Sequence, residues 1–254
     1  MSFFIFGKNK PSEKSKSLQN DPVEIAYYLF STLSVGKETP PQYSEIIRRE
    51  LELCDINNTG YPDKQTLLNR VIELVGPPDT PKQRYLLAMA YSWSHAEFRA
   101  KAIEYITLYL QNELFEDAYN NIIIPEDPAN PASWVSPKNQ HLSEMYLALG
   151  NAYLGENLNQ EALSSFQMAN EYAPSNSSTY YAMAKAYTHM NDLRGALSVF
   201  QSAKQSKYYV SRRWYDRVSG KYRDIVFWKS IDAGEKEILE KIQKGYIYRP
   251  RKKE

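Results

Sequence analysis

The stretch that decides the fold is residues 143–176, which read SEMYLALGNAYLGENLNQEALSSFQMANEYAPSN. With Ser143 as position 1, apolar and small residues stand at positions 4, 7, 8 and 11, and again at 20, 24 and 27. The first set forms one stripe of a helix, and the second set forms a stripe on the next helix. Gly150, Ala162 and Ala169 are small enough for the two helices to cross closely, and Phe166 fills the gap between them. The stretch therefore predicts a pair of packed helices joined at the turn residues 157–159.

The same pattern returns after a shift of 34 residues. In residues 177–210 the matching positions carry Tyr180, Met183, Ala184, Tyr187, Ala196, Phe200 and Ala203. A weaker copy starts at Gln83, with Leu86, Met89, Ala90, Trp93, Ala102 and Ile106 at the first six signature positions and Tyr109 in place of a small residue at position 27. Repetition at a fixed period predicts an array of helix pairs, each of which buries the apolar face of its neighbour.

This spacing resembles the tetratricopeptide repeat (TPR) family, whose signature residues 143–176 match throughout. The resemblance implies an all-α fold, a TPR-like α-solenoid that is a superhelical stack of antiparallel helix pairs. It also implies a protein that binds a protein or peptide segment in a concave groove, as an interaction scaffold rather than an enzyme.

The chain divides into six parts on this interpretation. They are a flexible basic N-terminus (1–20), an N-terminal helical segment (21–78), a degenerate TPR-like repeat (79–120), a proline-rich inserted loop (121–142), two TPR repeats (143–210), and basic-aromatic capping helices with a tail (211–254). No stretch alternates long enough to predict a sheet. Within the last part, Trp214 continues the 34-residue series, Asp232–Gly234 separates the basic-aromatic stretch from a last helix at 235–244, and residues 248–254 are expected to be frayed.

Groove residues follow from the resemblance alone. In TPR proteins, positions 2, 5, 9 and 12 of the first helix of each repeat line the groove, which here gives candidate ligand-binding residues Arg84, Leu87, Tyr91, Leu147, Asn151, Leu154, Tyr181, Lys185 and Thr188. This lining mixes apolar, tyrosine and polar side chains, which suits a peptide with apolar anchors. The sequence leaves open whether the groove is free or is occupied by the chain's own C-terminal helix or by the 121–142 loop.

Catalytic, metal and cofactor motifs are not found in the sequence. It has no GxxxxGK[ST], GxGxxG, HExxH or GxSxG pattern, and its three histidines have no ligand partner at helical spacing. Residues 55–60 resemble half of a calcium loop, but Thr66 stands where a bidentate glutamate is needed, so a glycine turn is the better interpretation. We expect no catalytic residue, metal or cofactor, while an enzyme without a recognisable motif stays as an alternative.

Charge is distributed unevenly, although the formal net charge is only +1. Residues 1–20 carry net +3, residues 21–204 carry −9, and residues 205–254 carry +7. The C-terminal basic residues are interleaved with aromatic ones, a composition that nucleic-acid binding uses. The alternative function is therefore a nucleic-acid-associated protein using Arg212, Arg213, Arg217, Lys221 and Arg223. Residues 21–76 carry net −4, which disfavours a DNA-reading domain at that end.

The compartment is suggested by cysteine usage and by the N-terminal sequence. Cys54 is the only cysteine, whereas a secreted protein of this size often carries pairs. Residues 1–8 have too short an apolar core for a signal peptide, and no apolar run is long enough to span a bilayer. We expect a cytoplasmic protein without a membrane span.

Overall fold

The computed structural model describes residues 21–33, 39–57, 59–120, 135–206, 209, 213–216, 221–224 and 226–249. The chain splits into two compact units, Met1–Ser94 and His95–Glu254. The predicted flexible N-terminus (1–20) and most of the predicted inserted loop (121–134) lie outside the described residues.

The N-terminal unit is helical, and its helices start where the sequence places caps and prolines. They are α2 (Pro22–Ser31), α3 (Pro41–Cys54), α4 (Lys64–Val75) and α5 (Pro81–Trp93). The Asp21 carboxylate accepts from the Val23 amide, and the Asp63 carboxylate accepts from the Thr66 amide. Thr80 and Gln83 form a reciprocal capping box at the start of α5.

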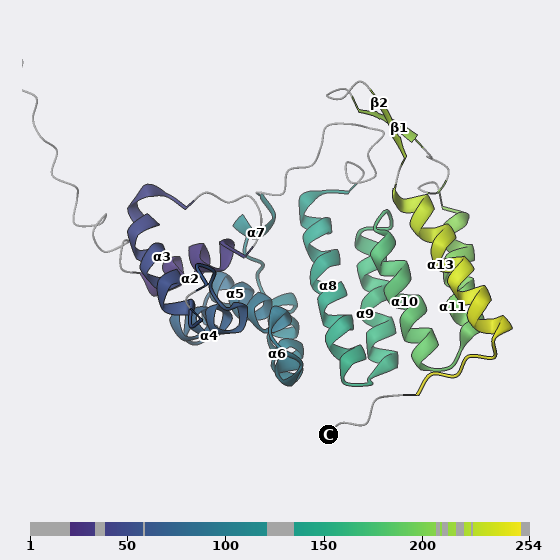
Figure 1. Ribbon diagram of the computed structural model, residues 1–254, viewed down its shortest axis with the longest axis horizontal. Coiled ribbons are helices and arrows are strands. Elements are labelled where there is room, and N and C mark those ends of the chain that lie inside the picture. The colour runs from purple at the N-terminus through teal and green to yellow at the C-terminus, as the bar shows by residue number, and fades with distance from the viewer. Residues whose placement is uncertain are drawn as a thin grey trace, which may run out of the picture. The chain divides into compact units, whose positions relative to one another are not determined.

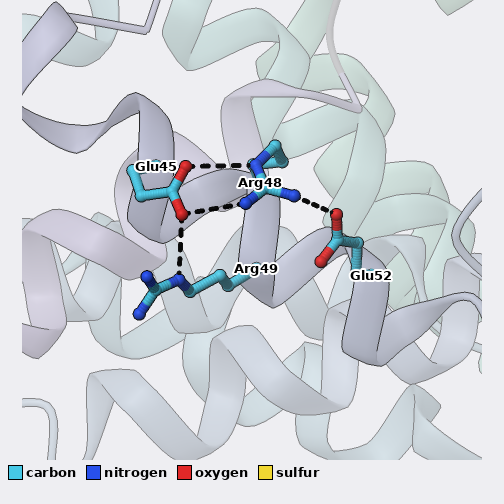
Figure 2. Close-up of polar contacts among 4 residues, drawn as sticks. All are labelled: Glu45, Arg48, Arg49 and Glu52. Atoms are coloured by element: carbon cyan, nitrogen blue, oxygen red, sulfur yellow. Dashed lines mark hydrogen bonds and ion pairs between the residues drawn. The ribbon is translucent and has the colours of Figure 1, made fainter.

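Helix α3 shows that charge in this unit is paired on the surface. Glu45 receives two bonds from Arg48 and one from Arg49, and Arg48 also reaches Glu52 (Figure 2). All four side chains are more than half exposed, so these pairs add little stability. Their effect is to satisfy both arginines within one helix, so the face is not a patch of unpaired positive charge.

The C-terminal unit holds the two repeats. Its elements are the 3₁₀ turn η1 (Ala96–Phe98), α6 (Arg99–Leu110), α7 (Asp117–Asn120), α8 (Pro137–Gly155), α9 (Asn159–Tyr172), α10 (Ser177–His189), α11 (Leu193–Lys204), the strands β1 (Arg213–Asp216) and β2 (Lys221–Asp224), and α13 (Val226–Gln243). Helices α8 to α11 pack one on the next in chain order, and α13 packs on α11 (Figure 1). The fold is therefore an all-α, TPR-like α-solenoid built from antiparallel helix pairs, as the sequence predicts.

Small residues bring the helices together as the repeat pattern requires. A Cβ at Gly150 of α8 would collide with the ring of Phe166 on α9, and that ring is fully buried. The Ser143 hydroxyl donates to the Ala169 carbonyl across the same pair at 2.8 Å. Gly150 is thus the site of a close helix crossing.

The structure differs from the sequence analysis at three places. Helix α8 begins at Pro137, inside the predicted 121–142 loop, because proline is well tolerated at the first position of a helix. Helix α13 runs through Gly234 without a break, since the absent side chain makes room for the buried Phe200 ring of α11. Residues 213–216 pair antiparallel with 221–224, so Trp214 lies in a short hairpin rather than in a capping helix.

The degenerate repeat at 79–120 stays a prediction. The division between the two units falls between α5 and α6, which are the two helices of that proposed repeat.

Candidate functional site

A cavity of about 510 Å³ lies in the C-terminal unit, between the repeat helices, α13 and the segment that follows α13. It is lined by Leu147, Asn151, Ser178, Tyr181, Ala182, Ala184, Lys185, Thr188, His189, Phe200, Gly234, Glu237, Ile238, Lys241, Tyr246 and Tyr248. Its walls therefore come from α8, α10, α11, α13 and the segment that holds Tyr246 and Tyr248.

The repeat places equivalent residues of α8 and α10 beside this cavity. Leu147 and Tyr181 are 34 residues apart, and so are Asn151 and Lys185. On each helix the two lining residues are four apart, which puts them on one face. Asn151 and Lys185 are solvent-exposed, so their polar groups are open to a ligand.

The floor of the cavity is aromatic and tightly held. The Tyr181 ring meets the Phe200 ring edge-on, with centroids 5.2 Å apart. Its hydroxyl donates to the Ser230 carbonyl of α13 at 2.7 Å. Because both ends of this side chain are fixed, the floor is formed before any ligand arrives.

The charged groups that line the cavity are two lysines and one glutamate. Lys241 pairs with Glu237 one turn away at 2.6 Å, while no ion pair of Lys185 is found within the described residues. Burial, followed by the charges of Lys185 and Lys241, lowers the pKa of His189 below its usual 6.5, so this ring is neutral near pH 7. Its Nδ1 is buried without a hydrogen-bond partner in the described part of the chain.

The chain's own C-terminal segment forms the remaining wall. Gly245 ends α13 with φ of +61°, and the Gly245 and Tyr246 amides donate back to the Ile242 and Lys241 carbonyls in a Schellman arrangement. The turn directs the next residues to the end of α10, where the Tyr248 ring stacks on His189. Tyr248 is therefore held in place, in contrast to the fraying expected there, and residues 250–254 lie outside the described residues.

The candidate groove residues are distributed over both units. Leu147, Asn151, Tyr181, Lys185 and Thr188 line the cavity. Leu154 is instead buried in the core cluster of the repeats. The other three, Arg84, Leu87 and Tyr91, lie on α5 in the N-terminal unit. There Leu87 is buried, and the Arg84 guanidinium donates to the Asp79 carbonyl.

The basic-aromatic candidates are only partly described. Arg213 is on β1, and Lys221 and Arg223 are on β2, whereas Arg212 and Arg217 lie outside the described residues. The strand register pairs Arg213 with Asp224 and Lys221 with Asp216. An acidic residue is therefore the register partner of two of the three described candidates.

The described residues contain no group of three or more His, Cys, Asp or Glu side chains that could hold a metal ion. The Asp55 carboxylate accepts from the Thr59 amide, the Thr59 hydroxyl and the Gly60 amide. The Thr59 backbone bond is the main reason why the pKa of Asp55 is lowered. This is the turn that the sequence favoured over a calcium loop.

The sequence does not predict that His189 and Asn191 contact Tyr248, or that residues 246–248 form a wall of the cavity. The one local indication was Gly245 directly after a helical pattern, since glycine there commonly ends a helix in the left-handed conformation. Nothing in the sequence connects Tyr248 to a histidine 59 residues earlier.

Comparison with known proteins gives a structural likeness only. No protein-family model matches the chain, and no curated protein matches it. Two crystal forms of MamA AMB-1 each align over 76% of this chain, at 16% identity and a TM-score of 0.43, and cover 92% and 99% of those chains. Another crystal structure of MamA aligns over 73% of this chain and 98% of its own, at 15% identity and a TM-score of 0.41. The fold is therefore assigned from the helix packing described above.

Among the described helices, none has both the length and the apolar character needed to cross a bilayer.

Proposed function

We propose that this protein is an interaction scaffold of the TPR type, which binds an extended peptide segment of a protein partner in the cavity of its C-terminal unit. The observation that carries the proposal is the lining itself: matching positions of two successive repeats, 147 with 181 and 151 with 185, line one cavity. Stacked repeats present a row of equivalent side chains along one surface, which suits a ligand that is itself linear.

The shape and chemistry of the cavity support a peptide rather than a small reactant. The floor is aromatic and aliphatic, while amide, hydroxyl and ammonium groups stand around it. Such a surface accommodates apolar side chains and hydrogen-bonds a peptide backbone at the same time. The proposal includes no catalysis, because the titratable groups that line the cavity are Lys, Glu, His and Tyr without a nucleophile paired to a base.

We also propose a cytoplasmic setting. Its support is the single cysteine, Cys54, which is buried and free. Burial raises the pKa of its thiol, so the thiol is protonated and unreactive near neutral pH. Immunolocalisation of the endogenous protein tests this part, and an extracellular or envelope location would contradict it.

The experiment for the binding function is a peptide-display selection against the full chain, followed by affinity measurements on variants. Asn151→Ala and Lys185→Glu should each weaken the selected peptides about tenfold or more, since both remove a polar group at the cavity. Lys236→Glu is the matched control, because Lys236 is an exposed residue of α13 that does not line the cavity.

Comparison of the variants distinguishes binding at the cavity from a general effect of charge. Equal losses with Lys185→Glu and Lys236→Glu would indicate only long-range electrostatics. Selected peptides that bind all three variants as tightly as the wild type would refute the proposed site.

A further inference from the structure

Two side chains at the end of α10 and in the turn after it, those of His189 and Asn191, take no part in capping α11. Asp192 caps α11 by accepting from the Gly195 amide at 2.7 Å. Its neighbour Asn191 is in the left-handed region, with φ of +61°, and its side-chain amide is not part of that cap. His189, the last residue of α10, lines the cavity. The end of α10 and the turn after it thus carry an imidazole and an amide two residues apart.

Both side chains contact the same residue of the C-terminal segment. The Tyr248 amide donates to Asn191 Oδ1 at 2.7 Å, and Asn191 Nδ2 donates to the Tyr248 carbonyl at 3.4 Å. The Tyr248 ring lies nearly parallel to the His189 ring, with centroids 3.8 Å apart and an angle of 11° between the planes. Asn191 therefore hydrogen-bonds the backbone of Tyr248, and His189 stacks on its side chain.

These two contacts define a ligand class. An amide that pairs with both the N–H and the C=O of one residue accepts any extended backbone, whatever the side chain. A neutral imidazole stacked face to face adds a preference for an aromatic ring, since such pairs contribute beyond the area they bury. The lowered pKa of His189 is consistent with the neutral form.

We propose that His189 and Asn191 form a recognition subsite for an aromatic residue in an extended peptide, and that Tyr248 occupies it until a partner peptide replaces it. This inference rests on the proposed function, because the subsite continues into the cavity: His189, Tyr246 and Tyr248 all line it. A peptide bound along α8 and α10 reaches His189 only by displacing the tail.

The tail is held weakly enough to be displaced. Between the two tyrosines, Ile247 is 67% exposed, and Arg249 is also exposed. Among the described residues, Tyr248 itself is held by one stacked ring and a pair of bonds to Asn191, while Tyr246 is held by the turn at the end of α13. A short tether still gives the tail an effective concentration in the millimolar range, so it competes with weak ligands.

Charge favours a partner over the tail. Lys185 and Lys241 line the cavity with Glu237, and the residue after Tyr248 is the exposed, basic Arg249. Positive charge beside positive charge is unfavourable, so a segment with acidic residues next to its aromatic one should bind better than the tail does. The inferred partner is thus an extended, acidic segment with an aromatic anchor.

The test uses full-length variants and three blocked hexapeptides. The first, KGYIYR, copies residues 244–249; the second, KGYIAR, lacks the second tyrosine; and the third, KGYIYE, ends in glutamate. Full-length Tyr248→Ala lacks the ring that stacks on His189 and should bind KGYIYR at least about tenfold tighter than the wild type. Full-length Ile247→Ala is the matched control and should behave as the wild type, because that side chain is exposed.

The peptides and the subsite variants report on recognition itself. In the Tyr248→Ala background, KGYIAR should lose measurable binding and KGYIYE should bind tighter than KGYIYR. Adding His189→Ala should abolish the binding of KGYIYR, while His189→Phe, which keeps a flat ring, should restore it. Equal binding of KGYIYR to the wild type and to Tyr248→Ala, or equal binding of KGYIYR and KGYIAR, would overturn the inference.

NMR chemical shifts of the His189 ring test the stack with Tyr248 without any measurement of peptide affinity. The ring protons of His189 should shift on Tyr248→Ala and stay unchanged on Ile247→Ala, and unshifted protons in Tyr248→Ala would contradict the stack. If display-selected peptides depend on Asn151 and Lys185 but carry no aromatic residue and ignore His189→Ala, the inference fails and the proposed function stands. If no selected peptide depends on Asn151 or Lys185, while KGYIYR binds Tyr248→Ala through His189, the proposed function fails and the subsite is supported.

Discussion

Two phenylalanines of the repeats each rest against a glycine on a neighbouring helix. Phe166 meets Gly150, and Phe200 meets Gly234. Both rings are almost completely buried, so neither can move aside for an added side chain. At these two positions glycine is required by close approach rather than by backbone conformation, since both residues are inside helices.

Gly150→Leu should lower the free energy of unfolding by about 1–3 kcal/mol, because overpacking exceeds the gain of about 1 kcal/mol in helix propensity. Urea unfolding of the full chain measures this. Gln167→Leu, which adds the same side chain at an exposed position of α9, should change stability by less than about 0.5 kcal/mol. A Gly150→Leu variant as stable as the wild type would contradict the crossing.

His141 is a second residue whose environment has a measurable consequence. It is buried on α8, where Tyr109 of α6 hydrogen-bonds its Nε2 at 2.8 Å and the Tyr119 ring of α7 lies beside it. The Tyr109 hydroxyl accepts from the Phe115 amide, which leaves its own proton for the imidazole. Burial lowers the pKa of His141 from 6.5 to about 4.

Stability should therefore fall as the pH is lowered from about 6.5 to about 4. In that window the unfolded chain takes up a proton that folded His141 does not, so the free energy of unfolding decreases, by about 3 kcal/mol in total from this residue. Denaturant unfolding at a series of pH values measures the slope. His141→Gln should flatten it, and an identical slope in both proteins would contradict the burial of a neutral ring.

At the scale of the elements, the end of α13 determines where the chain's last described residues lie. Gly245 adopts a conformation that costs other residues about 1–2 kcal/mol, and most of all a β-branched one. The two bonds of the Schellman turn then direct the segment toward Asn191.

Gly245→Val should release the tail without unfolding the repeats. We expect the His189 ring protons to shift as they do in Tyr248→Ala, and the helical circular dichroism to stay as in the wild type. Gln243→Val, an exposed substitution in the last turn of α13, is the control that should leave the stack intact. A Gly245→Val protein with unshifted His189 protons would show that the turn does not direct the tail.

The elements that the sequence predicts well are those with a local pattern. Ala162, Phe166 and Ala169 lie on one helical face, so the spacing alone predicts α9 and its partner α8. Gly234 by itself predicts a break because glycine weakens helices, and the local sequence does not show that Phe200 packs against it. The contact of Tyr248 with His189 joins distant residues by one stacked pair, for which no periodic pattern exists.

At the scale of the whole molecule, several charged residues of the C-terminal unit are paired with one another. Lys204 of α11 bonds Asp232 and Glu235 of α13, and these bonds raise its pKa. Lys241 pairs with Glu237. Lys204 therefore joins α11 to α13, while Lys241, which belongs to the basic part 205–254, is paired within α13.

The scaffold account predicts weak binding to generic RNA. Titration of the full chain with single-stranded RNA at about 50 mM and 200 mM salt should show no tight complex at the higher value. An affinity that falls by about 10³ or more between the two would favour the nucleic-acid alternative. Lys221→Glu combined with Arg223→Glu would then show whether β2 is responsible, since both residues lie on that strand.

One wall of the candidate site could be predicted from the sequence, and the other could not. The resemblance to the TPR family implies groove positions for five residues that line one cavity, namely Leu147, Asn151, Tyr181, Lys185 and Thr188. The opposite wall, from α13 and Tyr246 to Tyr248, depends on how the chain folds back after the last repeat. The repeat pattern ends before those residues, so it carries no information about them.

The central claim is that the cavity between α8, α10 and α13 binds an extended segment of a protein partner. Hydrogen–deuterium exchange of the full chain, with and without a display-selected peptide, tests it most directly. The account predicts slower exchange in residues 147–154 and 181–191 and faster exchange in residues 246–249, as the tail is displaced. Protection confined to the N-terminal unit, or to α9 with unchanged exchange in α8 and α10, would contradict it.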